Sequence, residues 1–248
     1  MNERQKKILE QLTNEHRVDV STLAERLCVS SVTMRKDLDF LEEMGLIRRM
    51  HGFAVIGPRD NLNNRLAYHY EDKRRIARLA AERVMPGETV MIESGSCCAL
   101  LAMELATAQR DVTIITNSAF IADYVRGRSH TKIVMLGGEY QSESQVVVGP
   151  LTVQSCEMFR VDKFYIGTDG FSPRYGFTGE DMMRVEAVKA MRRRANKLFI
   201  LTESEKFSRQ GVVSLLPFED ITALYTDEKI PPESEALLLT RGIDVYKA

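Results

Sequence analysis

The stretch VSSVTMRKDLDFLEEMGLIRRM, residues 29 to 50, decides the fold at the N-terminal end of this chain. Ser30 offers the side-chain oxygen that helix starts use as a cap, and Met34, Leu38 and Leu41 follow at helical spacing, which turns one stripe toward a core. The opposite side begins with short polar, apolar and basic side chains. We expect the outward residues near the helix start to be Ser31, Val32, Thr33, Arg35 and Lys36.

The neighbouring residues complete a helix-turn-helix and add a wing. Apolar spacing predicts two shorter helices before this stretch, with buried faces formed by Ile8, Leu9 and Leu12 in the first and Leu23, Ala24 and Leu27 in the second. Ser21 is the expected cap of the second helix, and residues 28 to 30 form the turn. After the recognition helix, Gly45 is the expected left-handed end, and residues 46 to 55 predict a short hairpin.

A helix in the major groove reads base edges through arginine, lysine, hydroxyl and methyl groups near its start. The hairpin adds Arg48 and Arg49 as expected backbone contacts. Net charge does not decide the matter, because residues 1 to 52 carry equal numbers of acidic and basic side chains. A three-helix bundle without DNA binding has the same periodicity, so the prediction rests on where the basic side chains lie.

The stretches ERQKKILEQL, VSTLAERLCVSSVTMRKDL and LEEMGLIRRMHGFAV resemble the DeoR-type bacterial transcription regulators. The resemblance extends over nearly the whole chain and implies a winged helix-turn-helix that binds double-stranded operator DNA. Its DNA-binding pattern consists of Thr33, Arg35, Asp37, Leu38, Gly45, Arg48, Arg49, His51 and Gly52. One position departs from the family, since Phe53 stands where a second glycine is usual.

With 248 residues and 44% hydrophobic content, the chain is long enough for a small and a medium domain. A turn-rich break begins at Gly57, so we expect a DNA-binding domain over residues 1–57, a linker over 58–70 and a second domain over 71–248. The chain start has no signal-peptide pattern, and its longest apolar run is far below membrane-spanning length. We therefore expect a soluble, cytoplasmic protein without a membrane partner.

The four cysteines form no CxxC pair and no metal-like cluster with the four histidines. Free, buried thiols that serve packing are expected, including Cys28 in the helix-turn-helix turn. The adjacent Cys97 and Cys98 could in principle sense oxidation, although nothing nearby argues for a lowered pKa. The sequence predicts neither a metal site nor a cofactor.

After residue 88, short apolar runs alternate with helical patterns. The runs are VMI, VTII, KIVML, KFYI, KLFIL, ALY and DVY, and the helical patterns cover residues 98–106, 119–125, 151–159, 181–195 and 234–241. This alternation predicts an α/β domain with a mostly parallel sheet covered on both faces. Ligands of such sheets bind beyond the carboxyl ends of the strands.

The turns after the predicted strands carry the candidate ligand-binding residues. Serines beside a glycine at a helix start suit an anion, although an ordinary serine cap explains them equally well. Asp169 could hold sugar hydroxyls or close an Asx turn, and Lys206 follows a strand end where it could meet an anion. The set consists of Glu93, Ser94, Gly95, Ser96, Cys97, Thr116, Asn117, Gly137, Gly138, Gly167, Thr168, Asp169, Gly170 and Lys206.

These turns also match the DeoR-type effector domain, whose fold resembles ribose 5-phosphate isomerase. The resemblance implies that the effector is a phosphorylated sugar or a related metabolite, and that the domain also forms a homodimer or homotetramer. Departures from the family are Glu93 and Glu203 for aspartate, Cys97 for threonine and Ser208 for glycine. They affect the sugar end of the site more than the phosphate end.

The combined expectation is a repressor of carbohydrate metabolism genes whose operator binding a phosphorylated sugar controls. The first alternative is a sugar-phosphate isomerase or hydrolase, for which Glu93, Asp169, Glu186 and Glu203 are conceivable general bases. No close catalytic pair follows from their spacing, and a shared fold carries no chemistry by itself. The second alternative is a protein-interaction module, which would leave the wing arginines without a role.

Overall fold

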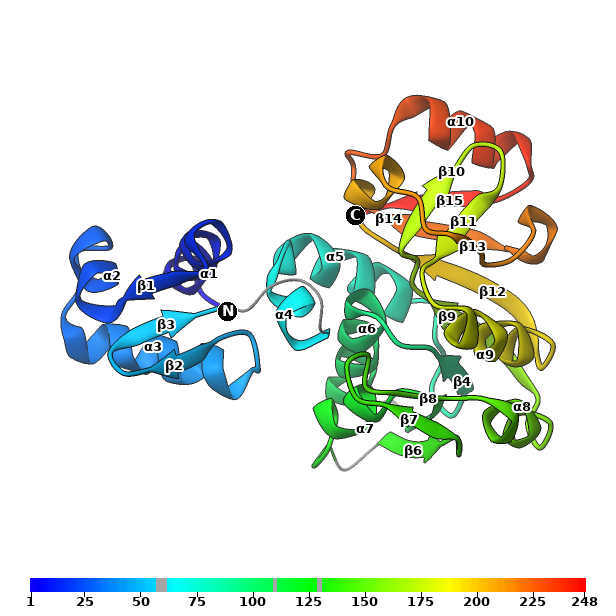
Figure 1. Ribbon diagram of the computed structural model, residues 1–248, viewed down its shortest axis with the longest axis horizontal. Helices are drawn as coiled ribbons and strands as arrows, with labels where there is room; N and C mark the ends of the chain where they lie inside the picture. The colour runs from blue at the N-terminus through cyan, green and yellow to red at the C-terminus, as the bar shows by residue number, and fades with distance from the viewer. Residues whose placement is uncertain (57–61, 109–110, 129–130) are drawn as a thin grey trace. The chain divides into compact units, whose positions relative to one another are not determined.

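The computed structural model describes residues 1–56, 62–108, 111–128 and 131–248 (Figure 1). They form two compact units, Met1–Tyr70 and Glu71–Ala248. The segment expected as a linker, residues 58–70, contains helix α4 (Leu62–Ala67) and the first residue of α5 (Tyr70–Ala81), and its residues 58–61 lie outside the described part. The sequence did not predict this helix, because its six residues are too few to show an apolar helical pattern.

The smaller unit is a winged helix-turn-helix, as the sequence predicts. Helices α1 (Glu3–Glu15), α2 (Val20–Arg26) and α3 (Ser31–Glu43) pack through side chains that are fully buried, among them Ile8, Leu12, Leu23, Met34, Leu38 and Leu41. Strands β1 (Arg17–Asp19), β2 (Arg48–Met50) and β3 (Phe53–Val55) form an antiparallel sheet in the order β1-β3-β2. Gly45 has a φ of +70°, which only glycine adopts without strain.

The helix caps follow the expected chemistry at α3 and differ at α2. Ser30 Oγ accepts the N–H of Thr33 at 3.2 Å, which fixes the start of α3. The cap of α2 is Asp19 rather than the expected Ser21, because the Asp19 carboxylate accepts the N–H groups of Ser21 and Thr22 at 2.8 and 3.2 Å. Because β1 ends at Asp19 and this residue caps α2, the helix begins two residues earlier than the apolar spacing indicates.

Cys28 is exposed, so the expectation that it serves packing is wrong. It has a φ of 52° in the turn between α2 and α3, and this left-handed backbone directs the side chain away from the core. The other three cysteines, Cys97, Cys98 and Cys156, are buried as expected.

A seven-stranded sheet organises the larger unit. Every neighbouring pair in the order β15-β14-β12-β9-β4-β5-β6 is parallel, and the seven strands coincide with the seven apolar runs of the sequence. The strands are β4 (Thr89–Ile92), β5 (Val112–Thr116), β6 (Thr131–Met135), β9 (Val161–Ile166), β12 (Ala195–Leu201), β14 (Ala223–Thr226) and β15 (Asp244–Lys247).

Helices cover both faces of this sheet (Figure 1). Helices α6 (Ser96–Thr107) and α7 (Ala119–Tyr124) contact β5 on one face, while α9 (Met182–Arg192) contacts β9 and β12 on the other, beside α8 (Pro150–Cys156). The main core lies on the α9 side, around Met91, Phe164 and Leu198. Helix α10 (Pro232–Thr240) adds Leu238 to that core and contacts β15.

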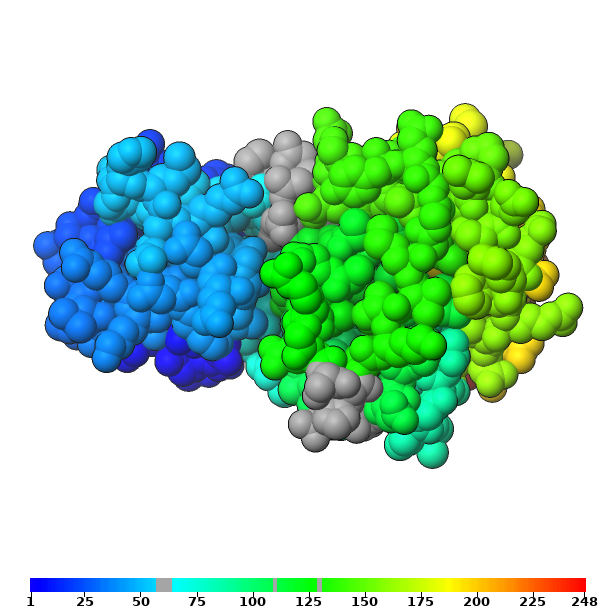
Figure 2. All heavy atoms as spheres, turned by 90° about the horizontal axis from the view of Figure 1, so that it is seen from below, coloured from blue at the N-terminus to red at the C-terminus, as the bar shows by residue number. Residues whose placement is uncertain are grey.

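Two small antiparallel sheets were not expected from the sequence. Strands β7 (Glu139–Gln141) and β8 (Val146–Val148) form a hairpin, and Figure 2 shows the surface around β6, β7 and β8 in green. Strands β10 (Gly170–Ser172), β11 (Gly176–Gly179) and β13 (Val213–Ser214) form the other sheet. Short 3₁₀ helices, η1 (Ser204–Ser208) and η2 (Phe218–Asp220), complete the unit. Strands of two to four residues are too short for alternation to identify.

Candidate functional site

The first turns of α3 present the side chains expected to read DNA. Ser31, Val32, Arg35 and Lys36 are exposed, and Val32 keeps 61% of its surface accessible although it is apolar. Arg35 and Lys36 make no ion pair or hydrogen bond within the described residues. Thr33 is half-buried, and its hydroxyl lies 3.0 Å from that of Ser30. The cap therefore engages Thr33, while its neighbours stay available to a partner.

Asp37, which belongs to the family pattern, holds the recognition helix in place rather than facing outward. Its carboxylate is buried and accepts the side chain of Gln5 at 3.0 Å and that of Arg4 in an ion pair. Both partners lie on α1. Because breaking a buried charged pair is costly, Asp37 fixes the position of α3 against α1.

The two wing arginines face different ways. Ala54 is the cross-strand partner of Arg49, whose side chain is ion-paired with Asp39 at 2.5 Å and Glu42 at 2.9 Å on α3. Arg48 is exposed and has no ion pair or hydrogen bond in the part of the chain that the structure describes. His51 is exposed at the wing tip with a φ of 48°. Arg49 thus ties the wing to the recognition helix, and its contact with phosphate stays a prediction.

The candidate effector site lies at the point where the order of the large sheet reverses. Strands β4 and β9 are neighbours there, and the following strands of each half are added outward on opposite sides. The turns that leave these two strands touch, since a Cβ built on Gly95 would lie 3.8 Å from Gly167 Cα. Open α/β sheets bind ligands at this switch point.

The start of α6 has no side-chain cap. Its N-cap residue is Gly95, with a φ of 126°, and neither Ser94 nor Ser96 bonds to the first N–H groups of the helix. The alternative of an ordinary serine-capped turn is therefore wrong at this position. Uncapped N–H groups at the start of a 12-residue helix, together with the helix dipole, favour a bound anion.

Glu93 is a buried carboxyl group at the end of β4. Burial raises its pKa from 4.5 to about 7, against the lowering effects of the hydrogen bond from Ser94 and of the nearby charge of Arg184. Ser94 Oγ donates to Glu93 Oε1 at 2.6 Å. A carboxyl group that gains or loses its proton near neutral pH can act as a hydrogen-bond donor or as an acceptor toward a ligand.

A buried ion pair flanks the same turn. Lys73 Nζ, on α5, lies 3.4 Å from Glu203 Oε1 at the end of β12, and Lys73 is only 2% exposed. Cys97 Sγ donates to Glu203 Oε2 at 3.6 Å. Burial alone would raise the pKa of Glu203, but the charges of Lys73 and Lys206 lower it to about 2. Glu203 is therefore ionised, and the two lysines give this side of the site positive charge.

Lys73 and Arg184 were not among the site residues expected from the sequence. A signal for Lys73 existed, because it shares the helical stripe of Ile76, Ala77 and Ala80, where a charged residue needs a buried partner. Arg184 reaches Asp169 Oδ2 at 3.5 Å from the first turn of α9. Nothing in the sequence places α9 beside β9, so this contact required the fold.

The cysteines beside the turn are not poised for oxidation. Burial raises the pKa of both Cys97 and Cys98 well above the usual value, and the negative charge of Glu203 acts in the same direction on Cys97. Since the thiolate is the reactive form, these thiols are inert.

The turn after β5 combines a helix cap with a buried polar atom that has no partner among the described residues. Thr116 Oγ1 accepts the N–H of Ser118, whose hydroxyl caps α7 through Ile121 N at 3.2 Å. Asn117 is fully buried at the end of β5, and its Oδ1 has no hydrogen-bond partner within the described residues. Asn117 thus keeps an acceptor for a ligand or a water molecule.

Gly137 and Gly138 follow β6, two strands away from β4, so the structure does not bring them to the switch point. A Cβ on Gly138 would lie 2.0 Å from Thr152 Oγ1, and that hydroxyl donates to Gly137 O at 2.8 Å. Gly138 therefore allows α8 to approach the backbone, whereas a Cβ on Gly137 would have no atom within 4 Å. Close packing explains Gly138 without a ligand.

The turn after β9 is held from several directions. Thr168 Oγ1 lies within 2.7 Å of Gly170 O and 3.0 Å of Thr178 O, and Asp169 Oδ2 accepts the N–H of Glu180 at 3.0 Å. The N–H that an Asx turn at Asp169 would need, that of Phe171 two residues ahead, donates instead to Arg209 O at 2.8 Å. A Cβ on Gly170 would lie 2.5 Å from Arg209 O, so this glycine allows the η1 segment to pack on β10.

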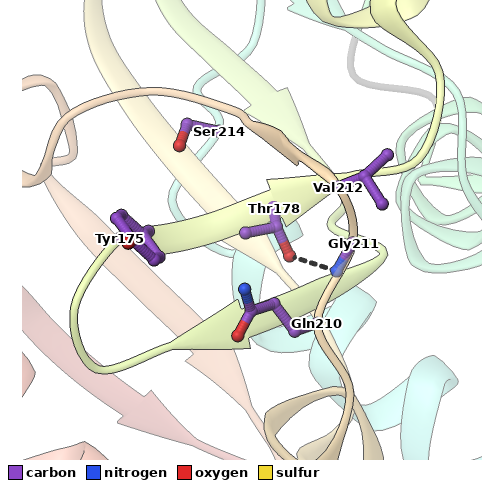
Figure 3. Close-up of a pocket in the computed structure, with 6 residues that line it drawn as sticks. All are labelled: Tyr175, Thr178, Gln210, Gly211, Val212 and Ser214. Atoms are coloured by element: carbon purple, nitrogen blue, oxygen red, sulfur yellow. Dashed lines mark hydrogen bonds between the residues drawn. The ribbon is translucent and has the colours of Figure 1, made fainter.

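A hollow of about 410 Å³ opens on the β10-β11-β13 sheet (Figure 3). Its lining is uncharged and consists of Tyr175, Thr178, Gln210, Gly211, Val212 and Ser214. Thr178 connects this hollow to the effector turn, because its side chain accepts Gly211 N at 2.8 Å while its carbonyl accepts Asp169 N at 3.0 Å.

Within the described residues, no helix is long and apolar enough to cross a membrane. The same residues contain no group of three or more histidine, cysteine, aspartate or glutamate side chains that could hold a metal ion.

A winged helix-turn-helix followed by a parallel α/β domain with a polar cluster at its switch point defines a class of transcription regulators that join a DNA-binding module to a sensing module. Residues 4–58 match the DeoR-like helix-turn-helix domain, and residues 68–228 match the DeoR C terminal sensor domain. The chain belongs to the DeoR family of helix-turn-helix transcriptional regulators.

Curated relatives align with nearly the full chain. The HTH-type transcriptional regulator GolR of Listeria innocua is 31% identical over 92% of this chain and 91% of its own length. The glycerol-3-phosphate regulon repressor of Escherichia coli K12 is 29% identical over 94% and 93%, respectively. The putative aga operon transcriptional repressor of E. coli O157:H7 is 27% identical over 98% and 92%.

Among solved structures, ribose 5-phosphate isomerase A of Methanocaldococcus jannaschii has a TM-score of 0.42 and 18% identity, and covers 56% of this chain and 55% of that chain.

Proposed function

We propose that this protein is a repressor of carbohydrate metabolism genes whose binding to operator DNA is controlled by a phosphorylated sugar. The observation that carries the effector proposal is the uncapped start of α6 at the switch point, with Lys73 and Lys206 near it. Helix N–H groups and lysine charges are the groups that bind phosphate. Two relatives that align with nearly the full chain are named as repressors, which supports repression over activation.

In this proposal, the phosphate binds at the turn Ser94, Gly95 and Ser96, with Lys206 as a counter-charge. The sugar hydroxyls then meet the carboxyl groups of Glu93 and Asp169 and the buried Asn117. These groups offer both acceptors and, for protonated Glu93, a donor. Cys97 supplies a less polar wall than the threonine usual in the family. Gly137 and Gly138 are left out, because they follow β6, two strands from β4, and packing against Thr152 accounts for Gly138.

The DNA side of the proposal uses the exposed residues of α3 for base edges, namely Ser31, Val32, Arg35 and Lys36, with Thr33 at the cap. Arg48 and His51 of the wing approach the phosphate backbone. A two-fold homodimer, or a tetramer built from two of them, would read half-sites spaced by about one helical turn or a multiple of it.

An enzymatic role has less support. Of the four conceivable general bases, Glu203 is held ionised by Lys73, and Asp169 already accepts Glu180 N. Glu186 is exposed and pairs with Lys189 at 3.1 Å. Glu93 remains, and its hydrogen bond comes from the hydroxyl of Ser94 rather than from a second acid or base.

The test is fluorescence anisotropy of the purified chain on DNA from upstream of its own gene. The titrants are glycerol 3-phosphate, pentose 5-phosphates, hexose 6-phosphates and the unphosphorylated counterpart of each. We expect one phosphorylated compound to change the DNA affinity and its free counterpart to have no effect. DNA binding that no phosphorylated compound alters would contradict the effector assignment. Turnover of a sugar phosphate would support the enzymatic alternative.

A further inference from the structure

The outer face of the wing sheet carries Arg17, which belongs neither to the DNA-binding pattern of the family nor to the hairpin of β2 and β3. Arg17, on β1, and Arg48, on β2, are both cross-strand partners of Val55 on the middle strand. Residues directly opposite one another in a sheet share a face, so Arg17 and Arg48 point to the same side. Arg49 and Ala54 occupy the inner face, toward α3.

Phe53 holds Arg17 on this outer face. The guanidinium carbon of Arg17 lies 3.8 Å from the centroid of the Phe53 ring, well within the range of a cation–π contact. Phe53 follows the wing tip directly and is half-buried. Its ring therefore directs Arg17 along the sheet toward the tip, where His51 and Gly52 form the turn.

The charge of Arg17 is available to a partner. Arg17 is exposed and makes no ion pair or hydrogen bond within the described residues. By contrast, Arg4 pairs with Asp37, Arg26 with Glu15, and Arg49 with Asp39 and Glu42. Of the arginines within residues 1–56, those without an acidic partner among the described residues are thus Arg17, Arg35 and Arg48, on α3 and on the outer wing face.

We propose that Arg17 is a further contact with the DNA backbone and that Phe53 positions it. Its charge takes the place of the charge of Arg49, which is paired with acidic residues of α3. The proposal rests on the proposed DNA-binding function. The ligand it assigns to the outer wing face is the phosphate backbone flanking the site that α3 reads. A cation held on an aromatic ring loses less freedom on binding phosphate, and it contributes equally to all sequences.

The test compares the salt dependence of DNA affinity for the full chain and three variants, Arg17→Ala, Phe53→Leu and the double variant. Each phosphate contact adds about 0.9 to the slope of log affinity against log salt. Arg17→Ala should reduce the size of this slope by about 0.9. The loss of DNA affinity on a fourfold rise in salt should then be about threefold smaller in Arg17→Ala than in the wild type. Discrimination between operator and unrelated DNA should not change.

Phe53→Leu keeps an apolar strand residue and removes the ring. It should lower the slope by less than Arg17→Ala does, and it should have no further effect on the slope in the Arg17→Ala background. Arg126→Ala, an exposed arginine of the larger unit, removes the same charge and serves as the control. Thermal unfolding of each variant verifies that the smaller unit stays folded.

The outcomes separate this proposal from the one it rests on. If the wild type binds with a salt-dependent affinity and Arg17→Ala leaves the slope unchanged, the Arg17 contact is wrong while DNA binding stands. If Phe53→Leu still lowers the slope when Arg17 is absent, the positioning role is wrong. If the wild type itself shows no salt-dependent binding, the proposed function fails first.

Discussion

At the scale of single residues, Arg35 is the side chain best placed to read a base, because it is exposed near the start of α3 and has no acidic partner among the described residues. Arg35→Ala should weaken operator binding by about 1–3 kcal/mol and relax the preference for one base pair. Anisotropy on operator DNA with single base changes measures both effects. Arg35→Lys keeps the charge and loses the forked geometry, so it separates the two contributions. Unchanged affinity in Arg35→Ala would remove it from the readout.

Glu93 makes the stability of the protein depend on pH in a predictable direction. Its pKa in the folded state, about 7, lies above its ordinary value of 4.5, so between these values the folded state holds a proton that the unfolded chain has lost. Stability from this group is complete below about pH 4.5 and declines as pH rises to about 7, by up to roughly 3 kcal/mol. Glu93→Gln should remove this decline.

Urea unfolding of the wild type and Glu93→Gln at pH 5 and pH 8 measures the difference. Glu203 does not confuse the comparison, because its pKa is lowered to about 2 and its contribution changes only in more acidic solution. Parallel pH profiles for the two proteins would show that Glu93 is more hydrated than its burial indicates.

At the scale of elements, the ion pair between Lys73 and Glu203 joins α5 to the end of β12. Lys73→Met leaves the Glu203 carboxylate buried without its nearest cation, which should destabilise the protein by about 3–5 kcal/mol. Adding Glu203→Gln should recover part of that loss. The midpoint of urea unfolding measures both.

The chain offers a matched control for this experiment. Lys189 and Glu186 form another pair, at 3.1 Å, but on the exposed side of α9. Lys189→Met should cost less than about 1 kcal/mol, because solvent screens exposed pairs. Equal costs for Lys73→Met and Lys189→Met would mean that burial does not strengthen the inner pair.

At the scale of the whole molecule, the proposed regulation requires that effector and DNA influence each other equally. An effector that weakens operator binding about 100-fold must itself bind the operator complex about 100-fold more weakly, a coupling of roughly 2.7 kcal/mol. Calorimetric titration of the active sugar phosphate into free and operator-bound protein measures this. Equal affinity for both forms, with DNA binding that still responds to the compound, would contradict a two-state mechanism.

The sequence by itself determined the helices of the helix-turn-helix and the strands of the large sheet. Local spacing identified α1, α2 and α3, and the seven apolar runs identified all seven strands of the large sheet, because buried strands and amphipathic helices leave periodic patterns. The turns with glycine and serine after β4 and β9 were also visible, since their backbone needs depend on a few neighbouring residues.

Only the tertiary structure decided which of these turns meet and which charges remain available. Gly95 and Gly167 come together because β4 and β9 are neighbours, whereas Gly137 and Gly138 follow a strand two positions away, where Gly138 packs against Thr152. The pairing of Arg49 with Asp39 and Glu42, and the contact of Arg17 with Phe53, also depend on how strands and helices pack. Such contacts join residues far apart in the chain, so the local spacing of apolar and polar residues does not reveal them.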